Sequence, residues 1–97
     1  MIKFDDGLSI FFKHYPEETG ISFDDDGKPM PFYGRTLCII EQNGESLRDG
    51  EAYCGINEPR FDKSIGRKVS LARALDGADK ELKTKIWKKY LETVKKT

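Results

Sequence analysis

The feature that most constrains this 97-residue chain is a change in the spacing of its apolar residues near residue 57. At the N-terminus apolar and polar positions alternate, which is typical of a half-buried strand; the apolar ones are Ile2, Phe4, Leu8, Ile10 and Phe12. After residue 57 apolar residues recur every three or four positions, which is typical of amphipathic helices. Strands first and helices last indicate an α+β fold.

The N-terminal half predicts an antiparallel sheet of three to four strands. One strand covers residues 2–15, in which Gly7 could mark a turn or bulge, and an apolar, β-branched strand covers residues 35–42. Asn43-Gly44 predicts a tight hairpin turn into a returning strand at residues 51–56. Residues 45–48 belong either to the edge of that strand or to a looser connection. Turns this short join antiparallel strands, because a parallel pair needs a longer crossover.

Between the first two strands, residues 16–34 are predicted to be a long irregular stretch, with three prolines and three glycines. Its centre, Asp24-Asp25-Asp26-Gly27, predicts an exposed turn. A short strand at 21–23 would reduce the length of the loop. Long loops are uncommon in compact domains and often functional, so this stretch is a candidate binding surface.

Two C-terminal helices, over residues 59–75 and 79–96, are expected to cover one face of the sheet. Asn57 with Pro59 predicts the start of the first helix, and Gly77 predicts its end. Asp79 is expected to cap the second helix. The buried side of the first helix is expected to hold Phe61, Ile65, Val69, Leu71, Ala72 and Leu75, and its outer side Lys63, Arg67, Ser70 and Arg73. The buried side of the second is expected to hold Leu82, Ile86, Trp87, Tyr90, Leu91 and Val94.

The composition fits a single small domain over residues 1–97. Charged residues make up 35% of the chain and hydrophobic ones 37%, while 11% aromatic residues are too many for a disordered chain. The net charge of zero hides an asymmetry: residues 1–50 hold five basic and ten acidic residues, and residues 51–97 hold twelve and seven. Such a chain is not a general polyanion binder, although its C-terminal half could form a local basic face.

No segment predicts contact with a membrane. No apolar run approaches the ~20 residues that a spanning helix needs, and the N-terminus lacks the features of a secretory signal. We therefore expect a cytoplasmic protein. If Trp87 and Tyr90 are exposed, they could form the interface of a homodimer.

Few residues could carry catalysis or bind a metal. His14 is the only histidine, and Cys38 and Cys54 lack the sequence context of a nucleophile or a zinc site. Both cysteines are expected to be reduced and buried as small apolar residues. The acidic run at 24–26 lacks the alternating ligands and closing glutamate of a calcium loop. We expect no enzyme, no metal and no cofactor, with a thiol enzyme that uses His14 and one cysteine as the remaining alternative.

Two surfaces could bind a macromolecule. For a protein partner the prediction is the acidic and aromatic stretch, through Asp24, Asp25, Asp26 and Tyr33. For a nucleic acid the alternative is the basic side of the 59–75 helix, through Arg60, Lys63, Arg67 and Arg73. Charged outer faces of surface helices usually serve solubility, which favours the first surface. Phe23 and Phe32 are expected to cover the open face of the sheet instead.

One segment resembles a pattern in small phage and prophage proteins. Gly50-Glu51-Ala52-Tyr53-Cys54 matches G-x-A-x-C, and residues 61–75 match F-x4-G-R-x-x-(A/S)-L-x-R-A-L. The match covers about a quarter of the chain, and it departs from the pattern at Glu58-Pro59-Arg60, before Phe61. Because the family is uncharacterised, it transfers no catalytic residue.

The resemblance implies a close contact between helix and sheet. Its small residues would let the helix lie on the strand that holds Ala52 and Cys54; these are Gly66, Ala72 and Ala74. Arg67 and Arg73 would tie the helix to the sheet edge or to a partner. A small phage protein without catalytic parts implies an inhibitor of a host defence or host protein, such as an anti-CRISPR protein, with a host or phage protein as its partner.

Overall fold

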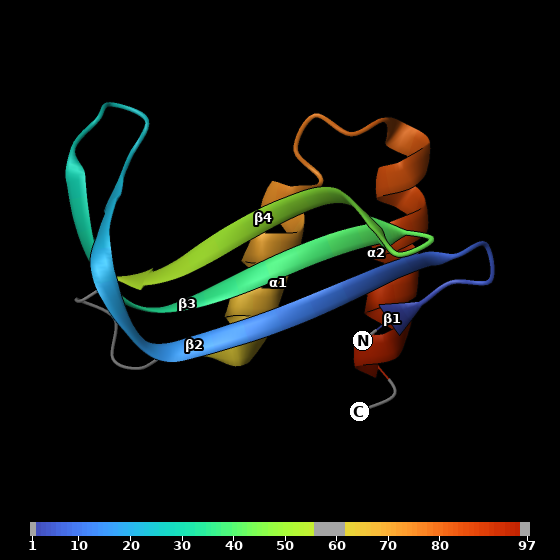
Figure 1. Cartoon of the computed structure of the whole chain (residues 1–97), viewed down its shortest axis with the longest axis horizontal. Coiled ribbons are helices and arrows are strands. Elements are labelled where there is room, and N and C mark those ends of the chain that lie inside the picture. Colours follow the sequence, from blue (N-terminus) through green and yellow to red (C-terminus); the bar gives the residue numbers. More distant parts are fainter. Residues whose placement is uncertain (1, 56–61, 96–97) are drawn as a thin grey trace.

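The computed structural model describes residues 2–55 and 62–95, which form one sheet and two helices (Figure 1). The elements in chain order are β1 (Ile2–Lys3), β2 (Leu8–Phe23), β3 (Pro29–Gln42), β4 (Glu45–Gly55), α1 (Lys63–Ala74) and α2 (Lys80–Lys95). The strands pair antiparallel in the order β1-β2-β3-β4. Both helices pack on one face of this sheet. The predicted α+β fold, an antiparallel sheet under two C-terminal helices, is confirmed.

The turn between β3 and β4 forms as the sequence predicts. Asn43 and Gly44 both take positive φ angles, 53° and 86°, which these two residue types tolerate and which suit the twist of a hairpin. β4 begins directly at Glu45, so residues 45–48 belong to the returning strand rather than to a looser connection.

The prediction of an irregular stretch over residues 16–34 is wrong. β2 and β3 continue through it as a two-stranded ribbon, in which residues 19–23 pair with residues 29–33. The pairing shifts register between Tyr15 and Thr19, and beyond this bulge the ribbon bends away from the rest of the sheet (Figure 1). We call residues 19–33 the hairpin arm. Its prolines are tolerated because the arm extends past Gly55, beyond which no described strand pairs with the outer edge of β3.

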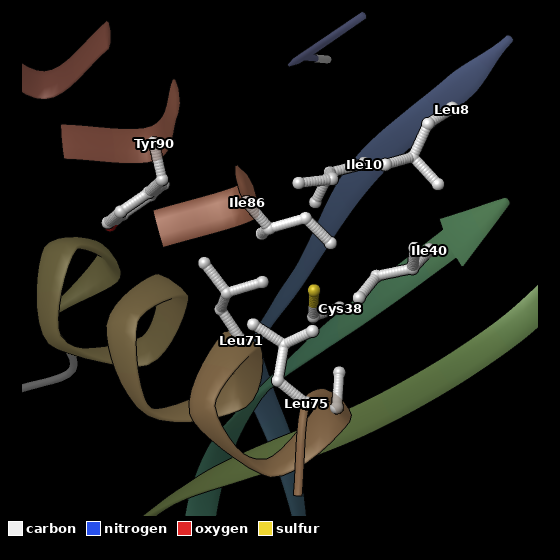
Figure 2. Close-up of a cluster of buried hydrophobic side chains, with 9 residues drawn as sticks. Leu8, Ile10, Cys38, Ile40, Leu71, Leu75, Ile86 and Tyr90 are labelled. Atoms are coloured by element: carbon white, nitrogen blue, oxygen red, sulfur yellow. The ribbon is translucent and has the colours of Figure 1, made fainter. Parts of the chain in front are cut away.

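The core lies between the sheet and the two helices. Figure 2 shows the buried side chains converging from four elements: Leu8 and Ile10 on β2, Cys38 and Ile40 on β3, Leu71 and Leu75 from α1 and the turn that follows it, and Ile86 and Tyr90 on α2. Each fully buried leucine or isoleucine contributes roughly 1.5–3 kcal/mol to the stability of the fold.

The start of α1 differs from the prediction. Asp62 is the N-cap, and its carboxylate accepts hydrogen bonds from the backbone N–H groups of Ser64 (2.9 Å) and Ile65 (3.3 Å). The predicted start at Asn57 and Pro59 lies outside the described residues.

The buried side of α1 also differs from the prediction. Ile65 and Ala72, expected inside, are exposed, while Ser70, expected outside, is fully buried. Leu71 and Leu75 are buried as expected. Phe61, also expected inside, lies outside the described residues.

The reason for this rotation is a contact between small residues. A Cβ atom on Gly50 of β4 would overlap the backbone nitrogen of Ala74 and lie 2.5 Å from the carbonyl oxygen of Ser70. A Cβ atom on Gly66 would overlap the hydroxyl of Thr36 on β3. Hydrophobic periodicity gives small residues little weight, so it identified the wrong side of the helix.

α2 follows its prediction more closely. Asp79 caps it, since its carboxylate accepts a hydrogen bond from the N–H of Leu82 (2.8 Å). Tyr90 is buried and Trp87 packs against the core, as expected for the buried side of this helix, so the two do not form an exposed surface for a homodimer. Leu91 and Val94, expected inside, are exposed. Neither described helix is long and apolar enough to cross a membrane.

Substitution of Gly50 by alanine should destabilise the protein by about 1–3 kcal/mol, because the new methyl group would meet helix backbone that cannot move aside as a side chain could. Urea denaturation measures the change. Asp49→Ala, one residue earlier on the exposed side of β4, is the control and should change stability by less than about 0.5 kcal/mol. Equal stabilities for the two variants would contradict the close contact.

Candidate partner-binding site on the hairpin arm

Three large apolar side chains on the hairpin arm are exposed to solvent. The exposed fractions are 61% for Ile21, 69% for Phe23 and 48% for Met30. They lie near the tip, where Phe23 pairs with Pro29; Ile21 and Phe23 share one face of the ribbon, and Met30, paired with Ser22, lies on the other. The expectation that Phe23 covers the sheet is therefore wrong. A group of exposed apolar side chains on a projecting element is typical of an interaction surface.

The acidic residues form the tip of the arm. The carboxylate of Asp24 accepts hydrogen bonds from the backbone N–H groups of Asp26 and Lys28, each at 2.9 Å. The N–H of Asp24 also donates to the carbonyl of Lys28 (3.1 Å), and Gly27 takes a φ of 79°. Asp24 thus orders the turn from within, while the carboxylates of Asp25 and Asp26 face solvent.

Arg35 fastens the base of the arm to the sheet. Its guanidinium lies 3.2 Å from the carboxylate of Glu18 in the β2 bulge and 3.2 Å from that of Glu51 on β4. It also stacks over the ring of Tyr15, 4.7 Å from the centroid. Burial acts to lower the pKa of Arg35, but the two carboxylates outweigh it and raise that pKa. One arginine in the central strand therefore links both of its neighbours.

An aromatic contact reinforces the same base. Phe32 is buried, and its ring packs on Gly20 across the arm, where a Cβ atom would lie 3.0 Å from the ring. The ring of Tyr53 lies 4.5 Å from that of Phe32, centroid to centroid. The hydroxyl of Tyr53 donates to Glu51, and this hydrogen bond raises the pKa of Tyr53.

The structure brings together only part of the predicted site. Asp24, Asp25 and Asp26 share the tip, whereas Tyr33 is half-buried at the base, paired with Thr19. Ile21 and Arg35 were missed. The sequence does show an arginine at the start of an apolar strand, which could have drawn attention to Arg35. Its two ion-pair partners, however, are remote in the sequence, so the sequence does not indicate them.

The basic residues of α1 do not form one uniform exposed surface. Arg73 donates a 2.7 Å hydrogen bond to the backbone carbonyl of Glu51, so the predicted tie between helix and sheet edge is confirmed for this residue. Lys63 is exposed and Arg67 is half-buried near His14. Arg60 lies outside the described residues.

Both cysteines are buried and unlinked, as expected. Burial raises the pKa of Cys38 to about 12, which keeps this thiol protonated at neutral pH. The Nδ1 atom of His14 is hydrogen-bonded to the hydroxyl of Thr36 at 3.0 Å. Within the described ranges, no three His, Cys, Asp or Glu side chains gather as metal ligands.

Comparison with protein families, curated proteins and solved structures finds no match to this chain. Its function is therefore inferred from its own residues and geometry.

Replacement of Asp24 by alanine should loosen the tip of the arm, because two backbone N–H groups lose their acceptor. We expect amide hydrogen exchange over residues 24–28 to become roughly tenfold faster, which corresponds to about 1.4 kcal/mol of local stability. Asp25→Ala removes the same charge from the next residue and should leave these exchange rates unchanged. Equal acceleration in both variants would show that charge, and not the turn geometry, orders the tip.

Proposed function

We propose that this chain is a non-enzymatic binding protein that docks its hairpin arm onto a protein partner. The observation that carries the proposal is the exposure of Ile21 and Phe23 on one face of a ribbon that projects from the sheet, with Met30 exposed on the opposite face. Burial of these side chains in an interface would remove their apolar surface from water, at roughly 25 cal/mol per Å².

The arm is ordered before it binds. Asp24 fixes the tip, and Arg35 and Phe32 fix the base. A ligand that is already in its bound conformation loses less conformational entropy on association, so its contacts contribute more to affinity. This arrangement suits insertion into a groove that already exists on the partner.

The chemistry of the arm defines the partner's surface. The apolar side chains require an apolar groove, and the exposed carboxylates of Asp25 and Asp26 require basic residues at its rim. The opposite charges would increase the association rate and orient the arm, while the apolar contacts would slow dissociation.

We further propose that the partner is a host protein and that docking inhibits it by occupying a functional surface, as an anti-CRISPR protein would. The resemblance of residues 50–54 and 61–75 to small phage proteins supports this step. The proposal places the protein in the cytoplasm of the host cell.

The alternative, a nucleic-acid-binding accessory protein, relies on the basic side of α1. Of its four predicted contacts, Arg73 already holds the carbonyl of Glu51. This engagement favours the hairpin arm, and nucleic-acid capture is a separate outcome of the test below.

Affinity capture from bacterial lysate, with and without nuclease, tests the proposal. We expect a protein partner that survives nuclease treatment and whose recovery falls at least about tenfold with Phe23→Ala, because a truncated aromatic anchor commonly costs 2 kcal/mol or more. Reversal of charge at Asp25 and Asp26 should mainly slow association.

Leu47→Ala is the matched control, since Leu47 is a similarly exposed apolar residue near the opposite end of the sheet from the arm. It should leave recovery unchanged. Equal loss with Phe23→Ala and Leu47→Ala would contradict docking through the arm. Recovery of nucleic acid alone, abolished by Lys63→Glu with Arg67→Glu, would replace the proposal with the alternative.

A further inference from the structure

Arg67 differs from the other arginines of the described ranges in that its guanidinium has no hydrogen-bond or ion-pair partner in these ranges. Arg35 pairs with two carboxylates, Arg48 donates to the carbonyls of Ala74 and Asp76, and Arg73 donates to the carbonyl of Glu51. Arg67 is half-buried, yet no hydrogen bond or ion pair joins its guanidinium to another described residue. No nitrogen of this guanidinium is buried without a partner, so the group reaches solvent and can bind an anion there.

The surroundings of Arg67 are also positive. Lys63 lies four residues earlier, one turn away on the same side of α1. Burial, and after it the positive charges of Arg67 and Lys63, lower the pKa of His14 on β2. On β3 the neighbour of His14 is the uncharged hydroxyl of Thr36, 3.0 Å from Nδ1, which fixes the orientation of the ring.

The close contact between helix and sheet creates this cluster. Gly66 lies in direct contact with Thr36, so the neighbouring residues of α1 lie close to the surface of the sheet. His14 is the cross-strand partner of Thr36. An imidazole, a guanidinium and an ammonium group, from two elements far apart in sequence, therefore share one small region of the surface.

We propose that His14, Lys63 and Arg67 form a binding site for a phosphate-type oxyanion between β2 and the first half of α1. The guanidinium offers a planar pair of donors and the ammonium a mobile one, which together suit the oxygens of a tetrahedral anion. The bound anion supplies a counter-charge, since none of the ion pairs between described residues involves Arg67. The site shares no residue with the hairpin arm, and this proposal does not depend on the function proposed for the arm.

Phosphate oxygens of this kind come either from a free anion, such as inorganic phosphate or a nucleotide, or from the backbone of a nucleic acid. A backbone phosphate should bind with a steep dependence on salt, because counterions are released along the strand. A free anion, titrated at constant ionic strength, releases no such counterions.

The single histidine makes the test direct. The Cε1 proton of His14 gives one NMR signal, followed while inorganic phosphate replaces chloride at constant ionic strength. We expect a saturable shift of this signal and a rise in the pKa of His14, because a nearby anion stabilises the imidazolium. Proton uptake should therefore accompany binding near neutral pH.

Arg67→Gln should weaken phosphate binding at least about tenfold, the effect of losing one charge-assisted hydrogen bond. Lys63→Gln should weaken it as well. Lys68→Gln, the same charge change at an exposed neighbour of Arg67, should leave binding unchanged.

A single-stranded oligonucleotide distinguishes the two sources. Displacement of phosphate by the oligonucleotide, with a steep salt dependence, would assign the site to a nucleic-acid backbone; binding of phosphate alone would assign it to a free anion. The absence of a saturable shift with either ligand, or equal affinities in wild type and Arg67→Gln, would overturn the proposal.

Discussion

The contact between the backbone of α1 and the sheet is the constraint on which the rest of the structure depends. At Gly50 and Gly66 the two surfaces meet without room for a Cβ atom. This short distance buries Thr36 and Ser70 and places Arg73 within reach of the β4 backbone. Interiors are close-packed, so a methyl group inserted here would displace an entire element rather than one side chain.

The hairpin arm exists because β2 and β3 are longer than the elements that cover and flank them. The described part of β4 ends at Gly55, beside Phe32, and beyond this pair no other described strand pairs with the ribbon. An isolated two-stranded hairpin is marginally stable in water. The ion pairs of Arg35, the packing of Phe32 and the turn at Asp24 compensate, and together they hold exposed apolar side chains in a defined position.

The two halves of the chain differ in charge as well as in secondary structure. Acidic residues gather at the tip of the arm, and basic residues lie on the helices, so the molecule presents two separate surfaces of opposite character. The arm combines acidic and apolar groups and suits a protein groove. The cluster of His14, Lys63 and Arg67 is small and uniformly basic, and it suits a single anion. Each surface can be altered without touching the other.

The sequence by itself determined the class of fold, because the switch from period-2 to helical spacing, the Asn43-Gly44 turn and the Asp79 cap are local signals. It also identified Asp24, Asp25 and Asp26 as an exposed turn. Only the tertiary structure decided that residues 19–33 form a paired ribbon, that Ser70 rather than Ile65 faces the sheet, and that Arg35 holds the base of the arm. These outcomes depend on partners remote in the chain and on close packing of small residues, and neither appears in the spacing of apolar residues.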